Sequence, residues 1–157
     1  MRPHRPVRRR PDGFSLIELT VVLTITATVT VVAVPTLLSY WDSLSLQAAA
    51  RELASAINLG RQLAIATRSP VCVDVSSTSL RFLVGGCAGD VWTGPSTDAS
   101  GSIRISDPAT LALSANARLV FTTLGAASPA ATYTLRHSRR RISRTVVVAA
   151  SGRISVE

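Results

Sequence analysis

The stretch Gly13-Phe14-Ser15-Leu16-Ile17-Glu18-Leu19 lies where a basic leader meets a long apolar run. Residues 1–12 contain five arginines and three prolines, and residues 19–41 contain no charged side chain. Glu18 is therefore the only charge near the start of the apolar run. A carboxylate at the centre of a membrane costs roughly 2.5–3.5 kcal/mol, so such acids usually have a partner and a function. The simpler alternative is an ordinary signal anchor whose acid lies near the lipid headgroups.

The leader and the apolar run predict a processed membrane anchor. The arginines favour a cytoplasmic location for residues 1–13, which read as a processing segment. A lone segment in a bilayer must be helical, and about 20 residues span the roughly 30 Å hydrocarbon layer, so residues 14–38 predict a transmembrane helix. The apolar run is longer than that of a cleaved secretory signal and no convincing small-x-small cleavage site follows it, so we expect the anchor to be retained. Pro35 predicts a kink because it lacks an N–H, and Tyr40 and Trp41 fit an interfacial belt.

The charge of the chain is concentrated in its leader. The whole sequence has a formal net charge of +8, and every basic side chain is an arginine. Without residues 1–13, 12 basic and 8 acidic side chains remain, a net charge of about +4. This modest excess does not by itself demand an acidic partner.

Residues 39–68 predict an amphipathic continuation of the same helix. Apolar and small residues recur at spacings of three and four, which is typical of one buried face. Gly60 weakens a helix by about 1 kcal/mol relative to alanine, so we expect something to pack closely there. Ser69-Pro70 should end the helix, because the residue before a proline resists the α conformation. The residues of the predicted buried face are Leu46, Ala50, Leu53, Ile57, Gly60 and Ala64.

Residues 70–157 predict a β domain. Apolar residues alternate in Val71–Val75 and again in Leu80–Val84, with a turn at residues 76–79. Residues 85–102 are rich in Gly, Ser, Asp and Pro and predict an exposed loop. A long helix followed by short strands predicts an α+β fold with antiparallel sheets. The further predicted strands are 102–106, 118–122, 132–136, 145–149 and 152–156.

Two cysteines, Cys72 and Cys87, follow the membrane segment and should lie in an oxidising compartment. A hairpin that pairs Val75 with Val84 would place the cysteines directly opposite each other. Directly opposed Cβ atoms are about 4.5–5.5 Å apart, close to disulfide range. We therefore expect a Cys72–Cys87 disulfide, with two buried free thiols as the alternative.

The sequence predicts neither an enzyme nor a cofactor site. His137 is the only histidine after the leader, it stands among arginines, and no orienting carboxylate lies near it in the sequence. No cluster has metal-ligand spacing, and Gly85-Gly86-Cys87-Ala88-Gly89 does not open a helix as a phosphate-binding loop does. The arginine cluster near His137 is either a solvated turn or a phosphate-binding patch. Its residues are Arg136, Arg139, Arg140, Arg141 and Arg144, with Arg153 further along.

The N-terminal motif resembles the class III signal of type IV prepilins and type II secretion pseudopilins. The resemblance implies that a prepilin peptidase cuts after Gly13 and that the new N-terminal residue, Phe14, is N-methylated. It assigns Glu18 to assembly, as the partner of a neighbouring subunit's N-terminal amine. It also implies a single-pass inner-membrane protein with a cytoplasmic N-terminus before processing and a periplasmic C-terminal domain. Other major and minor pseudopilins and an inner-membrane assembly platform would be its partners.

Within the pseudopilins, the chain resembles the GspH/FimT family. The likeness rests on Ala48–Leu53, Leu59–Ala66, Arg68–Val71 and the closing Ser151–Val156. It implies a pilin-like fold, with a long helix packed on an antiparallel β domain, and the function of a minor pseudopilin in type II secretion. The alternative is a FimT-like minor pilin that binds DNA for uptake. Some such proteins use a Gly-Arg-x-Arg element, in which Ser155 replaces the second arginine here.

Overall fold

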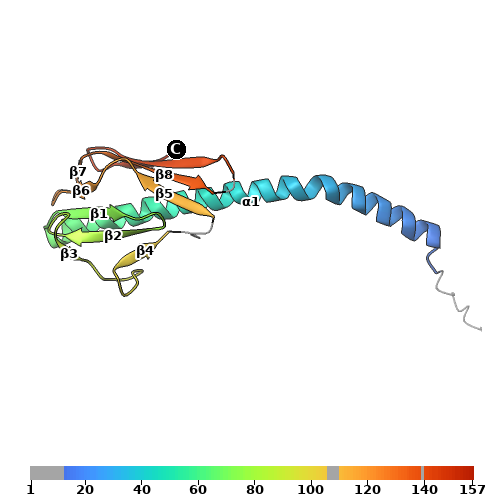
Figure 1. Ribbon diagram of the computed structural model, residues 1–157, viewed down its shortest axis with the longest axis horizontal. Coiled ribbons are helices and arrows are strands. Elements are labelled where there is room, and N and C mark those ends of the chain that lie inside the picture. Colours follow the sequence, from blue (N-terminus) through green and yellow to red (C-terminus); the bar gives the residue numbers. More distant parts are fainter. Residues whose placement is uncertain (1–12, 106–109, 139) are drawn as a thin grey trace, which may run out of the picture. The chain divides into compact units, whose positions relative to one another are not determined.

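The computed structural model describes residues 13–105, 110–138 and 140–157. Of the predicted leader, only Gly13 lies within the described residues. The chain divides into two compact units, Met1–Tyr40 and Trp41–Glu157. The long helix α1 (Leu16–Thr67) contributes to both of them (Figure 1).

The described part of the first unit consists of residues 13–15 and the N-terminal part of α1, and every described side chain in it is exposed. By length and composition, α1 is suited to crossing a membrane. Pro35 lies inside the helix, which continues through it. The kink at Pro35 stays a prediction.

In the second unit, α1 buries the face that the spacing of its apolar residues predicts. All six predicted positions are buried, together with Ala49 and Ala56. Gly60 does pack closely, as expected, because a Cβ built there would lie 2.6 Å from Cε1 of Phe82. The helix ends at Thr67, and Arg68 follows with a φ of 51° ahead of Pro70. The prediction that Ser69-Pro70 ends the helix is therefore confirmed.

Two antiparallel sheets complete the second unit (Figure 1). The first has the order β3-β2-β1-β6-β7, and β4 also pairs with β2. The second has the order β10-β9-β8-β5. Side chains from α1 and from both sheets form one apolar core, so the predicted α+β architecture is confirmed. The strands are β1 (Val71–Val75), β2 (Ser79–Val84), β3 (Asp90–Val91), β4 (Ser102–Arg104), β5 (Leu111–Ala115), β6 (Leu119–Phe121), β7 (Ala127–Ser128), β8 (Ala131–His137), β9 (Ser143–Val148) and β10 (Ile154–Val156).

Cys72 and Cys87 form a disulfide, with Cα atoms 5.0 Å apart, but the predicted register is wrong. Val75 pairs with Leu80 and Cys72 with Leu83, because the short turn at residues 76–79 fixes the pairing. Cys87 lies beyond the end of β2. Two glycines with positive φ, Gly85 and Gly86, turn the chain back, and both of their N–H groups donate to the carbonyl of Pro70. This turn, rather than cross-strand pairing, brings the cysteines together.

The structure contains strands that the sequence pattern did not predict. β3 lies inside the expected loop, and Trp92 just after it packs on Phe82 with ring centroids 6.1 Å apart. β5 and β7 were missed as well. The sequence of β5 is Leu-Ala-Leu-Ser-Ala, whose composition favours helix more than strand, and β7 is two residues long. Pairing with β8 and β6 respectively provides their backbone partners.

Candidate assembly helix and arginine turn

The junction at Gly13 and Phe14 is open and non-helical. α1 begins at Leu16, and the N–H of Leu19 donates to the carbonyl of Ser15 at 3.1 Å. The peptide bond between Gly13 and Phe14 thus precedes the first helical turn. Phe14 is 86% exposed, and a Cβ built on Gly13 would meet no atom within 4 Å. Packing within the described residues therefore does not require a glycine at position 13.

Glu18 lies in the first turn of α1 and is exposed. A negative side chain near a helix N-terminus is favoured by the helix dipole, typically by about 0.3–1 kcal/mol. That benefit alone could account for an acid here in water. It does not account for an acid at the start of an apolar helix that is suited to a membrane, where a charge needs a partner.

The hydroxyl groups of the apolar segment are satisfied inside the helix. Each donates to a backbone carbonyl three or four residues earlier, at 2.7 to 3.1 Å. An unpaired hydroxyl in an apolar medium costs several kcal/mol, so these bonds make a threonine-rich segment compatible with lipid. The residues are Thr20, Thr24, Thr26, Thr28, Thr30 and Thr36.

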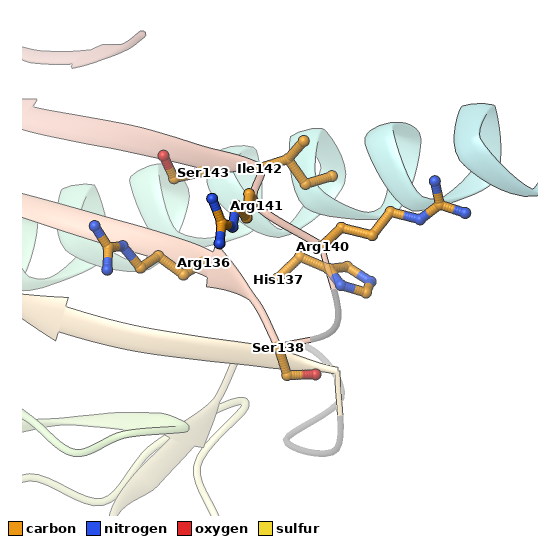
Figure 2. Close-up of a pocket in the computed structure, with 7 residues that line it drawn as sticks. All are labelled: Arg136, His137, Ser138, Arg140, Arg141, Ile142 and Ser143. Carbon is orange, nitrogen blue, oxygen red and sulfur yellow. The ribbon is translucent and has the colours of Figure 1, made fainter.

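The second candidate site is the connection between β8 and β9, residues 138–142, which we call the arginine turn. The N–H of His137 donates to the carbonyl of Ile142, and the N–H of Ser138 donates to that of Thr110. These bonds hold the base of the turn against β9 and the start of β5. A cavity of about 620 Å³ opens here (Figure 2). Its lining residues are Arg136, His137, Ser138, Arg140, Arg141, Ile142 and Ser143.

Asp42 on α1 contacts the arginine turn. Its carboxylate pairs with Nε of Arg140, and its Oδ1 lies 3.8 Å from Nε2 of His137. The sequence shows no carboxylate close to His137, and this one comes from a distant part of the chain. The two residues are 95 positions apart, and the packing of α1 against the second sheet brings them together. At 3.8 Å, Asp42 does not hold His137 in the hydrogen-bonded geometry of a catalytic pair.

The predicted basic residues do not form one patch. Arg136, Arg140, Arg141 and Arg144 are exposed at one end of the β8–β9 hairpin. Arg153 lies at the other end of β9, where its carbonyl accepts from the N–H of Ala149. Five residue steps along a strand correspond to about 17 Å. Arg139 lies outside the described residues.

Gly152, next to Arg153, has a structural role. Its φ is +79°, and a Cβ there would lie 2.0 Å from the carbonyl oxygen of Gly125. Arg61 on α1 donates from Nε to the same oxygen at 3.0 Å. The closing Gly-Arg pair thus begins with a glycine that the packing requires. This explains the glycine without any ligand.

Two further clusters of polar side chains were considered among the described residues as a metal site or a binding site. Among them, no group of three or more His, Cys, Asp and Glu side chains is placed to hold a metal ion. Hydrogen bonds from Ser100 and Ser102 lower the pKa of Asp98, whose carboxylate orders its own loop. This cluster is satisfied within the loop.

Comparison with known families gives two matches. The family model described as type II transport protein GspH matches residues 49–152. The prokaryotic N-terminal methylation motif matches residues 8–34, which include Gly13, Phe14 and Glu18. No curated protein matches the chain by sequence.

Solved structures share the fold. The type IV minor pilin FimU of Pseudomonas aeruginosa is 20% identical, with a TM-score of 0.55 over 71% of this chain and 92% of that one. The minor pseudopilin EpsH of Vibrio cholerae is 14% identical, with a TM-score of 0.55 over 72% and 96%. GspH of E. coli is 13% identical, with a TM-score of 0.57 over 71% and 86%. Identities this low establish the pilin-like fold and nothing finer.

The GspH match extends from the buried face of α1 to the glycine that packs on Gly125, and so covers most of the second unit. The methylation motif covers the junction and most of the apolar segment. The chain therefore belongs to the GspH family of type II transport proteins and is a minor pseudopilin, a structural subunit that assembles with other pseudopilins.

Proposed function

We propose that the subunit matures by cleavage between Gly13 and Phe14 and N-methylation of Phe14, and that Glu18 then directs its entry into the pseudopilus. The observation that carries the proposal is the position of Glu18. It is the one charge between Phe14 and Trp41, in the first turn of a helix whose described side chains are all exposed through Tyr40. Such a surface needs a cover, either lipid or other subunits.

The glycine before the junction supports cleavage there. A Cβ built on Gly13 would meet no atom within 4 Å, so packing among the described residues does not explain the glycine. The junction is exposed and non-helical, as a protease substrate needs to be. A peptidase that admits no side chain at this position would explain the glycine.

The energetic role of Glu18 follows from the medium. Cleavage gives Phe14 a positive amine, and lateral packing of apolar helices would remove both the amine and the Glu18 carboxylate from water. Breaking a buried ion pair by removing one partner costs about 3–5 kcal/mol. Pairing between adjacent subunits therefore makes assembly depend on correct register. A membrane helix could carry the pair only in this neutralised form.

The same features support a location and partners. The apolar part of α1 anchors the subunit in the inner membrane, with residues 1–13 cytoplasmic before processing and the second unit periplasmic. The prepilin peptidase and an inner-membrane assembly platform would act on it in turn. The platform would extract the helix from the bilayer, and the amine–carboxylate pair would offset part of the cost of that transfer.

The experiment compares Glu18→Gln with Glu52→Gln in cells that express the parent secretion system. Glu52 is exposed on the amphipathic part of α1, so its neutral variant is a matched control for the loss of one carboxylate. We expect Glu18→Gln to leave the protein in the membrane but reduce its crosslinking into sheared pseudopili at least tenfold, and Glu52→Gln to behave as wild type. Intact mass spectrometry of the purified subunit reports cleavage and methylation separately.

Two results would refute the proposal. An N-terminus that retains residues 1–13 in fibre-associated protein would remove the maturation step. Equal incorporation of Glu18→Gln and wild type would remove the assembly role of the carboxylate, even if the junction is cleaved.

DNA uptake by a type IV pilus is the second candidate, and the exposed arginine turn favours it. The geometry gives it less support than the sequence did. Asp42 pairs with Arg140, and Arg153 lies at the other end of β9. A gel-shift titration of the matured chain with duplex DNA at low salt tests it. Micromolar binding that Arg140→Ala/Arg141→Ala abolishes would favour DNA uptake, and no binding would exclude it.

A further inference from the structure

We propose that the connection between β6 and β7, residues 122–125, docks into an apolar pocket with an acidic rim on another pseudopilin. We call this connection the leucine turn. The proposal rests on the family to which the chain belongs and not on the maturation of Phe14. It assigns a protein contact to the second unit, separate from the contact proposed for Glu18 in the first.

The leucine turn presents an apolar side chain to solvent. Leu124 is 87% exposed, more than any other large apolar side chain described in the second unit. Ile65 on α1 is 46% exposed and lies against the same turn, because a Cβ built on Gly125 would be 2.9 Å from the Cδ1 of Ile65. The turn and the last part of α1 therefore offer two neighbouring apolar groups.

Hydrogen bonds within the turn fix its conformation. The N–H of Gly125 donates to the carbonyl of Thr122, and the N–H of Thr122 donates to the carbonyl of Ala126, both at 2.8 Å. The hydroxyl of Thr122 accepts from the N–H of Ala126 at 3.1 Å. Gly125 has a φ of +80°, which glycine adopts readily and other residues do not. These features hold the backbone at Leu124 in one conformation.

Contacts with α1 and with the β9–β10 connection hold the turn from outside. Arg61 donates from Nε to the carbonyl of Gly125 at 3.0 Å. Gly152 approaches the same oxygen so closely that a Cβ there would lie 2.0 Å from it. A single exposed leucine needs no function on its own. This one stands next to a buried glycine on a backbone held from both sides, so little conformational freedom would be lost when a partner covers it, which favours affinity.

The groups around the leucine turn are positively charged. Arg61 contacts the turn, the N–H of Arg68 donates to the carbonyl of Ile65 at 3.4 Å, and Arg153 directly follows Gly152. Among the described residues, none of these three arginines forms an ion pair. Opposite charges speed encounter and like charges oppose it. A partner that covers the turn is therefore expected to carry carboxylates around its pocket.

A folded protein fits this surface better than lipid or nucleic acid does. Burying a leucine in a pocket is worth at least about tenfold in affinity, and rigid groups that fill pockets dominate protein interfaces. Binding to a membrane surface scales with the apolar area buried, and two side chains supply little of it. Phosphate contacts with DNA would use the arginines and leave Leu124 unexplained. Another pseudopilin is the natural occupant, because members of this family assemble with other pseudopilins.

The test is isothermal titration calorimetry of the full-length mature chain in detergent. Each of the other pseudopilins of its secretion system, also full-length and mature, is titrated in turn. We expect one of them to bind, and to bind more weakly as salt rises because the surroundings of the turn are charged. Leu124→Ala should weaken this binding at least about tenfold.

The matched control for the apolar contact is Leu44→Ala. Leu44 is also an exposed leucine of the second unit, but it lies 21 residues before Ile65, about 32 Å along α1. This variant should bind as wild type does. Both variants should keep the wild-type unfolding temperature, so that a loss of binding is not a loss of folding.

A second pair of variants tests the charges. Arg68→Gln/Arg153→Gln should weaken binding by roughly two- to twentyfold and flatten its dependence on salt, because each exposed ion pair contributes up to about fivefold. Arg136→Gln/Arg144→Gln removes the same charge at the opposite end of β9, from side chains that are also exposed. It should leave both the affinity and the salt dependence unchanged.

Two results would overturn the proposal. One is that no pseudopilin of the system binds the wild-type chain, and the other is that Leu124→Ala leaves binding unchanged. If duplex DNA or short-chain phosphatidylglycerol binds in a Leu124-dependent way while no pseudopilin does, the occupant is not a pseudopilin. Glu18→Gln should bind as wild type does in this assay, so a failure of docking is distinguishable from a failure of the assembly role proposed for Glu18.

Discussion

Replacing Gly60 with alanine tests whether the contact between α1 and β2 is as close as the structure shows. A Cβ at this position would lie 2.6, 3.0 and 3.3 Å from three ring carbons of Phe82. Carbon atoms in contact prefer about 3.5–4.0 Å, so the ring would have to move by about 1 Å. Phe82 is fully buried and also packs on Trp92. The ring therefore has little room to move.

Two opposing terms set the magnitude. Alanine is a better helix former than glycine by about 1 kcal/mol, which would stabilise the variant. Overpacking a well-filled core typically costs about 1–3 kcal/mol, which would destabilise it. We expect the steric term to win and Gly60→Ala to lose about 1 kcal/mol. For a unit of this size, the midpoint of thermal unfolding should then fall by about 3–6 °C.

A double-mutant cycle isolates the contact. Phe82→Leu removes the ring, so in that background Gly60→Ala should gain up to about 1 kcal/mol instead of losing it. The change of sign corresponds to a coupling free energy of about 1–3 kcal/mol, within the range for residues in direct contact. Unfolding of the full chain in detergent, followed by near-ultraviolet circular dichroism, gives the four free energies of unfolding. Equal effects of Gly60→Ala in both backgrounds would refute the close packing of α1 on Phe82.

Three further predictions concern the second unit. Tyr133 is fully buried, and its hydroxyl has no hydrogen-bond partner within the described part of the chain. An unsatisfied buried group costs about 1–3 kcal/mol, so Tyr133→Phe should unfold at the same temperature as wild type or higher. A clearly lower unfolding temperature would show that the hydroxyl has a partner. Burial also raises the pKa of the Tyr133 phenol. Because the unfolded phenol then ionises first, wild-type stability should fall as pH rises above about 10, and Tyr133→Phe should lose less. The disulfide joins residues 15 apart, and closing such a loop contributes about 3 kcal/mol. Cys72→Ser/Cys87→Ser should therefore unfold at a lower denaturant concentration, and reductant should lower the wild-type midpoint without affecting the variant; identical midpoints would contradict this.

The amino-acid sequence by itself determined the elements whose signals are local. Helix periodicity identified the buried face of α1, and Ser69-Pro70 located its end, because both depend on residues within a few turns. Gly60 signalled a close contact because a glycine is costly in a helix. The junction at Gly13 and the isolated charge of Glu18 were visible without any fold. These local signals, read together with the resemblance to pseudopilins, led to the family that the comparisons show.

Tertiary structure alone decided what depends on residues distant in the chain. The glycine turn after β2, which is held by the carbonyl of Pro70, rather than strand pairing, brought Cys87 to Cys72. β5 became a strand because β8 supplied its hydrogen-bond partners, against the helical preference of its residues. Packing between segments far apart in the chain brings Asp42 into contact with the arginine turn. The length of β9 separates Arg153 from the same turn. Such pairings have no local signature in the sequence, because their free energy arises only when separate segments come into contact.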